Sequence, residues 1–205
     1  NPYGEFYLDS IKNSYARHPY KRPGIGNIAE LDASKLPEVR AFHSTFYRPD
    51  NATLIVVGDF LPNELHDWVE KYFGPIKKPS EKIPRVTTRE PPRTEDKQII
   101  KYSPKVPLPA IAVTFLAPSI RSEDAPALDL AGEILAGGES SRLYQSLVYE
   151  QQIAQQASFE PDLNEDLGLL TARIILASGK SPEAAEKALT AQIDAKLPYV
   201  ELTSI

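Results

Sequence analysis

A short apolar run with a sharp break on each side sets the strongest limit on the fold. Residues 52–57 read ATLIVV, with Pro49-Asp50-Asn51 before them and Gly58-Asp59 after them. Beta-branched residues favour extended backbone, and the flanking residue types favour turns. An apolar run without polar alternation is typical of a strand covered on both sides. We therefore expect a strand here that is buried on both faces, or nearly so.

Helices and further strands flank this run in two blocks. In the first block, helical spacing of apolar residues predicts a helix over 34–47 and a second that starts at Pro62 and stops at Gly74-Pro75. The second block predicts strands over 97–102, 110–118 and 167–177 and helices over 122–138, 139–152 and 181–197. This mixed order predicts an α+β chain of two-layer domains, with helices on one face of a largely antiparallel sheet.

A basic, proline-rich stretch separates the two blocks. Residues 77–105 hold nine basic and four acidic side chains and five prolines, whereas residues 106–205 are acidic. Proline blocks helix and charge disfavours burial, so we interpret the stretch as a solvated linker rather than as a nucleic-acid or lipid site. We expect residues 1–78 to be the C-terminal part of a first α+β domain, 79–96 the basic linker, and 97–205 most of a second α+β domain.

Composition removes several classes of protein. The 205 residues contain no cysteine, which excludes disulfides, zinc–thiolate sites and cysteine nucleophiles. No run of 18 apolar residues predicts a membrane-spanning helix. The net charge of −5 argues against a dedicated nucleic-acid binder. The chain starts at Asn1 and contains no methionine, so we expect a processed product or a fragment.

The three histidines do not form a metal motif. His66 and Glu70 lie one helical turn apart and could begin a metal site, but we favour a solvated pair. His43 lies beside apolar residues on a predicted helix and is interpreted as peripheral. His18 lies in a proline- and glycine-rich loop and would be functional only with partners that the sequence does not identify.

Glycine-rich and acidic stretches give no stronger signal. Gly137-Gly138 could form an anion-binding loop, but we interpret them as the end of one helix, with Glu139 or Ser140 capping the next. The pair Glu165-Asp166 is interpreted as a solvated turn. The residues themselves therefore predict no catalytic, no cofactor-binding and no metal-binding residue in this chain.

Taken in order, the motifs resemble one family. The segments HPY (18–20), IG (25–26), YRPDNA (47–52), VVGD (56–59) and KYFG (71–74) are similar to the pitrilysin/insulinase family of zinc metallopeptidases, in the subgroup that includes mitochondrial processing peptidase. The stretch LAGGESSRLYQSL (135–147) is similar to a helix pair in the second domain of that family. The resemblance covers nearly the whole chain. It gives the run at 52–57 a framework role rather than a catalytic one.

The resemblance places the chemistry outside this chain. In the family, two histidines of an H-x-x-E-H motif and a later glutamate hold zinc, and the glutamate of the motif is the general base. No H-x-x-E-H occurs here, so all catalytic residues are expected upstream of Asn1. The substrate-binding Arg and Tyr of the family's distal half fall on Val148 and Gln155, so that pair is absent and the proximal half is implied.

The expected function follows from this resemblance. The chain would be a non-catalytic portion of a bacterial zinc endopeptidase, with zinc in the parent and none here, and it would complete a clamshell chamber that encloses peptides. Its expected partners are the rest of the parent peptidase or a homologous subunit, together with peptide substrates and no nucleic acid. A periplasmic location is implied. The alternative is an assembly subunit of the same fold without protease activity.

Overall fold

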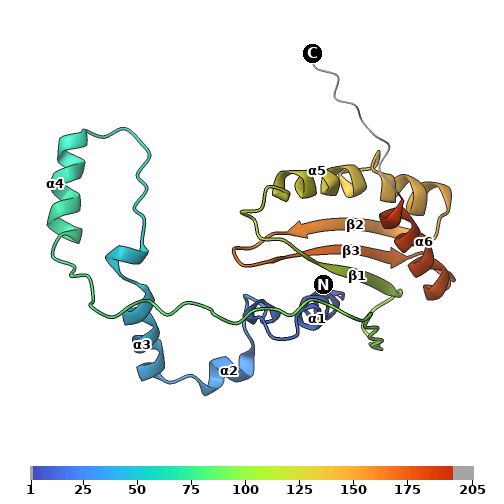
Figure 1. The fold of residues 1–205 in the computed structure, drawn as a ribbon, viewed down its shortest axis with the longest axis horizontal. Helices are drawn as coiled ribbons and strands as arrows, with labels where there is room; N and C mark the ends of the chain where they lie inside the picture. Colours follow the sequence, from blue (N-terminus) through green and yellow to red (C-terminus); the bar gives the residue numbers. More distant parts are fainter. Residues whose placement is uncertain (1, 196–205) are drawn as a thin grey trace, which may run out of the picture. The chain divides into compact units, whose positions relative to one another are not determined.

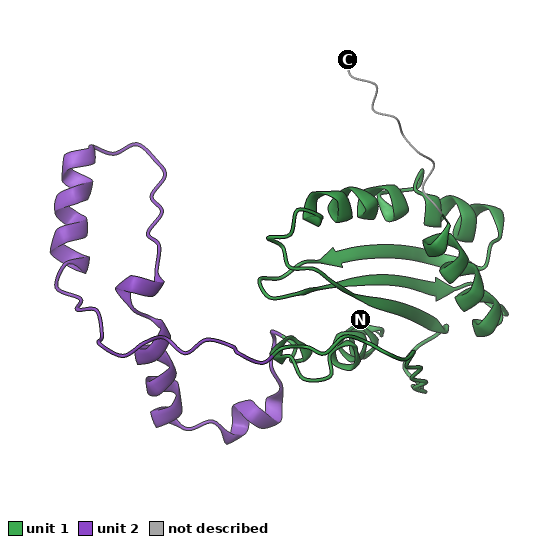
Figure 2. Cartoon of the chain, viewed as in Figure 1, with its two compact units in different colours: residues 1–23, 89–205 green, residues 24–88 purple. Residues whose placement is uncertain are grey.

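The computed structural model describes residues 2–195, and the chain forms two compact units (Figure 2). Unit 1 comprises residues 1–23 and 89–205, and unit 2 comprises residues 24–88. The first 23 residues therefore belong to the same compact unit as the second block. This division differs from the boundaries at residues 78 and 96 that the sequence suggested. Among the described residues, none of the helices has the length and apolar character needed to cross a bilayer.

Unit 1 is built on a three-stranded antiparallel sheet. The strands are β1 (Ala110–Ala117), β2 (Ala154–Asp162) and β3 (Gly168–Leu176), in the order β1-β3-β2. A register shift between Ala154 and Gln156 leaves Gln155 as an irregularity in β2. Helix α5 (Ala125–Ala136), the π-helix η3 (Tyr144–Glu150) and α6 (Pro182–Asp194) pack on the sheet, whereas α1 (Gly4–Ser14) lies on the opposite side from α5 and α6 (Figure 1). The predicted α+β class with an antiparallel sheet is confirmed.

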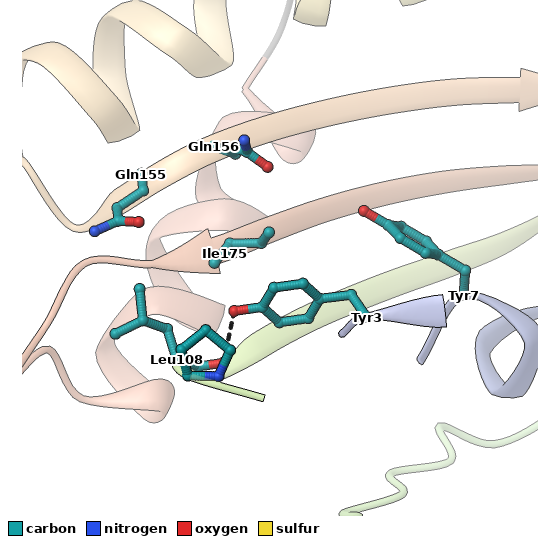
Figure 3. Close-up of a pocket in the computed structure, with 7 residues that line it drawn as sticks. Tyr3, Tyr7, Leu108, Gln155, Gln156 and Ile175 are labelled. Carbon is teal, nitrogen blue, oxygen red and sulfur yellow. Dashed lines mark hydrogen bonds between the residues drawn. The ribbon is translucent and has the colours of Figure 1, made fainter. Parts of the chain in front are cut away.

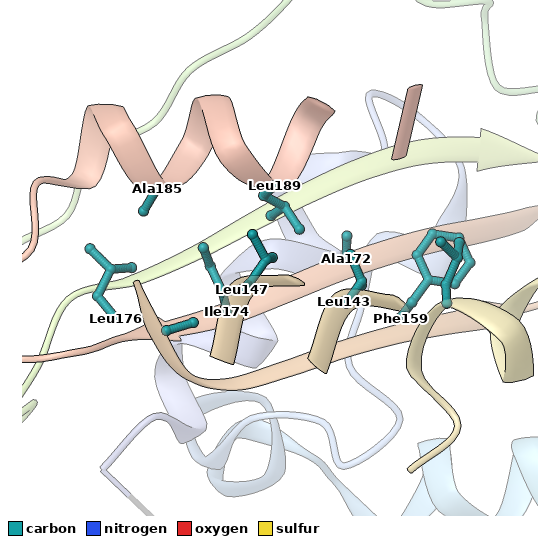
Figure 4. Packing of buried hydrophobic residues seen from close by; sticks show 10 residues of the cluster. Leu143, Leu147, Phe159, Ala172, Ile174, Leu176, Ala185 and Leu189 are labelled. Atoms are coloured by element: carbon teal, nitrogen blue, oxygen red, sulfur yellow. The ribbon is translucent and has the colours of Figure 1, made fainter. Parts of the chain in front are cut away.

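The core of unit 1 lies between the sheet and these helices. On β3, Ala172, Ile174 and Leu176 alternate toward the core, as a period of two requires. They meet leucines from η3, from the residue just before it and from α6, and these leucines have no exposed surface (Figure 4). Those leucines are Leu143, Leu147 and Leu189. Leu143 and Leu147 are thus part of the hydrophobic core of unit 1.

Unit 2 contains three helices and a structured turn. The helices are α2 (Ile28–Ala33), α3 (Leu36–Phe46) and α4 (Pro62–Phe73), and the short 3-10 helix η2 covers Pro49–Asn51. Arg48 is buried and donates from Nε to Asp50 Oδ1 at 2.6 Å and from Nη2 to the Pro79 carbonyl at 2.9 Å. The turn before the apolar run is thus held by a bidentate ion pair, the strong form of such a contact.

Two predicted strands are wrong within this chain. Residues 52–57 and 97–102 are extended but form no ladder with any described strand. Their apolar side chains are exposed, with Ile55 at 78%, Val57 at 92% and Tyr102 at 92%. A strand needs a neighbour for its N–H and C=O groups, and side-chain pattern alone does not supply one.

The remaining elements divide into confirmed predictions and omissions. The strands over 110–118 and 167–177 and the helices over 34–47, 62–73 and 122–138 agree with β1, β3, α3, α4 and α5 within a few residues. The helix predicted over 181–197 is α6, and residues 196–197 lie outside the described part. Strand β2 and helices α1 and α2 were not predicted. Strand β2 carries two glutamines and a proline that weaken its pattern, and α1 puts residues on the sheet face that was expected to lack helices.

Candidate functional site

Chemistry-bearing side chains gather at the loop that follows α1 in unit 1. His18 is only 1% exposed and caps the short 3-10 helix η1 (Pro19–Lys21), where its Nδ1 accepts from the Tyr20 N–H at 3.3 Å. An accepting Nδ1 assigns the proton of the neutral ring to Nε2. That nitrogen faces Asp166 Oδ2 at 3.4 Å. The Tyr20 hydroxyl accepts from the Asp166 N–H at 3.3 Å, which joins the loop to the β2–β3 turn.

Glu90 brings the returning linker to the same loop. Its carboxylate accepts from the backbone N–H groups of Ala16, Arg17 at 2.9 Å and His18 at 2.7 Å. Burial raises the pKa of Glu90, but the three N–H groups outweigh burial and hold the pKa below its ordinary value. Consecutive backbone amides that converge on one anion form a concave site with a fixed positive potential. In this chain that site is filled by the protein's own side chain.

Tyr15 lies beneath this loop and is 4% exposed. Its ring packs near those of His18 and Tyr20, with centroid distances of 6.3 and 6.2 Å. Burial first, and then the Asp162 carboxylate, raise the pKa of Tyr15 to about 12. The phenol therefore stays neutral across the physiological range, and it cannot act there as a base.

The cluster is suited to holding segments together rather than to catalysis. A His–Asp pair does chemistry only beside a nucleophile or a metal-bound water. The contacts of His18 are instead a capped turn, a carboxylate and two aromatic rings. Among residues 2–195, no group of three or more potential metal ligands converges. No catalytic step is assigned to these residues.

The other histidines and the acidic pair have ordinary surroundings, with one exception. His66 Nε2 lies 3.5 Å from Glu70 Oε1, and both side chains are more than 70% exposed, as a solvated pair would be. His43 stacks on Tyr47 with ring centroids 4.8 Å apart. Glu165 is solvated beside Arg121, but the interpretation of Asp166 as merely solvated is wrong, because it binds the loop at His18.

The glycine pair ends one helix, but the predicted cap of the next helix is wrong. Helix α5 ends at Ala136 with Gly137 as its C-cap, and Gly138 has a positive φ of 82° that favours glycine. Neither Glu139 nor Ser140 caps the next helical segment, because that segment begins at Arg142 with the Ser141 carbonyl accepting from the Gln145 N–H. No anion site is needed to explain this turn.

A shallow cavity of about 370 Å³ lies between α1 and the end of the sheet (Figure 3). Figure 3 shows Tyr3 and Tyr7 from the α1 region on one side and Gln156 and Ile175 from the sheet on the other. The Tyr3 hydroxyl donates to the Leu108 carbonyl at 3.1 Å. Gln155 also lines the cavity, whereas Val148 packs against the core. The two positions singled out by the family resemblance therefore have unrelated surroundings here.

Sequence reasoning missed Glu90 and Tyr15. Glu90 is one carboxylate among basic and proline residues, and only the fold shows that it meets residues 16–18. The signal that could have drawn attention to it is the short sequence Glu90-Pro91-Pro92, which fixes a carboxylate on a stiff segment.

Comparison with known proteins gives a consistent result. The family model for the peptidase M16 inactive domain matches residues 35–197. A zinc protease of Helicobacter pylori, PqqE, is 29% identical over 199 residues, which are 96% of this chain and 44% of that protein. The chain thus spans less than half the length of this relative.

Solved structures agree with the family match. A protease from Helicobacter pylori superposes with a TM-score of 0.81 at 27% identity, over 89% of this chain and 45% of the other. A peptidase M16 inactive domain from Pseudomonas fluorescens gives 0.73 at 18% identity, over 94% and 46%. Pitrilysin gives 0.63 at 16% identity, over 91% and 21%, and these last two likenesses concern the fold alone.

Proposed function

The chain belongs to the peptidase M16 inactive-domain family, and we propose that it is the non-catalytic portion of a zinc-dependent endopeptidase. One observation carries the proposal. The family match covers residues 35–197, yet the chain contains no H-x-x-E-H motif and its potential ligands do not converge within the described residues. The parent holds the zinc, and this chain completes the chamber that encloses peptide substrates.

The exposed surface of unit 2 favours a partner that is another part of the same peptidase. Its extended residues 52–57 present unpaired backbone, and the exposed side chains include Ile55 and Val57. On α3 and α4, Phe42 is 57% exposed and Trp68 is 51% exposed. So much apolar surface is normally covered in a folded protein. A partner that contributes strands satisfies both needs, since it pairs the backbone and covers the side chains.

A reconstitution experiment tests the proposal. The purified 205-residue chain is assayed with a quenched peptide, and its zinc content is measured by mass spectrometry. We expect no hydrolysis and no stoichiometric zinc. The longer parent, with its upstream segment restored, should hydrolyse the peptide in a chelator-sensitive way. Chelator-sensitive hydrolysis by the isolated chain would overturn the proposal.

Hydrogen exchange tests the partner separately. In the isolated chain the amides of residues 52–57 should exchange rapidly, whereas in the parent they should be slowed by roughly a hundredfold or more because they enter a sheet. Equal exchange in both proteins would show that this segment pairs with nothing. The assignment of residues 1–78 to the end of a first α+β domain would then be abandoned.

The alternative is an assembly subunit of the same fold without protease activity. Sequencing the parent gene upstream of Asn1 distinguishes the two. An H-x-x-E-H helix with a following glutamate supports the peptidase, and a broken motif supports the assembly subunit. The relatives are bacterial. A bacterial parent in the periplasm is proposed on the family resemblance, and fractionation of the source cells checks it.

A further inference from the structure

The chain passes between the two units at two places, and both lie beside the His18 loop. It leaves unit 1 through residues 16–23, here called the exit segment, and re-enters it through residues 89–93, the return segment. Helix α1 precedes the exit segment and β1 follows the return segment. The two segments are more than 60 positions apart in sequence, so any contact between them is made by the fold and not by chain proximity.

Glu90 joins the two segments directly. Its carboxylate belongs to the return segment, and the three N–H groups that it accepts from belong to the first residues of the exit segment. Hydrogen bonds to an ionised acceptor are stronger than neutral ones. The depressed pKa of Glu90 agrees with a carboxylate that is ionised in this position.

The neighbouring arginines hold the return segment to unit 1 in a different way. Arg93 donates from Nη2 to the Ser14 carbonyl at 2.8 Å and contacts Thr114 on β1. Arg89 pairs with Asp166 at 3.4 Å, but its side chain is 79% exposed and the pair contributes little. Arg93 therefore anchors the return segment to α1 and β1, and Glu90 anchors the exit segment to the return segment.

We propose that Glu90 is a positioning residue that closes the exit and return segments into one attachment, from which unit 2 is tethered. With the carboxylate in place, the exit segment and the return segment are both held to unit 1. Without it, the exit segment opens locally while unit 1 stays folded. The reason is that the hydrophobic core contains none of these residues and is formed with α5, η3 and α6. Glu90 acts together with Asp166, which contacts His18 and Tyr20 of the same exit segment.

Three variants of the whole chain test this attachment. E90A removes the carboxylate, and E90Q keeps the size of the side chain but removes the charge and one accepting oxygen. E95Q is the matched control, because Glu95 lies in the same linker, is exposed and loses the same charge. Hydrogen exchange with mass spectrometry follows peptides that cover residues 15–18 and residues 168–176. Limited trypsin digestion follows cleavage after Arg17 and Lys21.

The expected result is local opening. Exchange at residues 16–18 and cleavage in the exit segment should rise by about tenfold or more in E90A and E90Q, with β3 unchanged. E95Q should behave as the unsubstituted chain. The proposal is overturned if E90A leaves residues 16–18 as protected as before. It is also overturned if β3 loses protection to the same degree, or if E95Q reproduces the effect.

Discussion

Leu189 offers a test of the core that positions every other feature of unit 1. Its side chain has no exposed surface and points from α6 toward the sheet (Figure 4). Leu189→Ala removes three carbon atoms. At about 0.8 kcal/mol for each buried methylene-sized group, transfer alone contributes roughly 2.4 kcal/mol. The cavity left behind raises the expected loss in the free energy of unfolding to about 3 kcal/mol.

Leu130→Ala is the matched control, because Leu130 is also helical but 60% exposed. It should change the free energy of unfolding by less than about 0.5 kcal/mol. With a urea slope of about 2 kcal/mol/M, Leu189→Ala should lower the midpoint for unit 1 by about 1.5 M, and the control should leave it nearly unchanged.

The assay must report each unit separately. Pulsed hydrogen exchange of peptides from 168–176 during a urea titration reports unit 1. Fluorescence of Trp68, the one tryptophan in the sequence, reports unit 2 from helix α4. Equal midpoint shifts for Leu189→Ala and Leu130→Ala would refute the assigned core. An equal shift of the Trp68 transition would refute the division into two units.

Three smaller predictions concern single groups. The pKa of Tyr15 is about 12 in the folded chain against an ordinary 10.0, so its contribution to the stability of the fold is fully present below pH 10 and is lost as pH rises toward 12. In an absorbance titration, the tyrosine that ionises last should be missing from Tyr15→Phe. The pKa of Glu90 is lowered, so its contribution to the stability of the fold is present above its ordinary pKa of 4.5 and is lost as pH falls below that value. The stability of Glu90→Gln should therefore change less with pH during acid unfolding than that of the unsubstituted chain. Ser181 Oγ accepts from the Ala184 N–H at the start of α6, so Ser181→Ala should cost about 1 kcal/mol in thermal unfolding, and Ser140→Ala, at an exposed site, should cost nearly nothing.

Local signals in the sequence were enough for most helices and for two strands of the sheet. Ser181 followed by Pro182 marks the start of α6, and Gly137 marks the end of α5, because caps depend only on neighbouring residues. Strand β3 is read correctly because eight of its nine residues are apolar, glycine or β-branched and it is central in the sheet. Strand β2 is an edge strand with polar residues, and such strands carry a weaker pattern.

The candidate site could not be predicted, because its members are distant in sequence. His18 was recognised only as a loop histidine, and Asp166 only as part of a turn. Their 3.4 Å approach depends on α1 docking on the sheet and on the β2–β3 turn lying beside it. The contact of Glu90 with residues 16–18 depends on the same docking. Contacts of this kind follow from the tertiary fold, and no periodicity or cap encodes them.

The two strand predictions are wrong for a physical reason that also bears on the proposed function. Residues 52–57 and 97–102 have the composition of strands, but a ladder is a property of two segments and composition describes one. Within the described residues, β1 and β2 each pair with β3, and neither predicted strand pairs with any of the three. The strand propensity at 52–57 therefore specifies half of an interaction, and we propose that the rest of the parent peptidase supplies the other half. This agrees with the proposed peptidase, which keeps its zinc ligands on one portion and its framework on another. The framework portion needs no reactive side chain, and it must instead present strand edges that pair and a stable core.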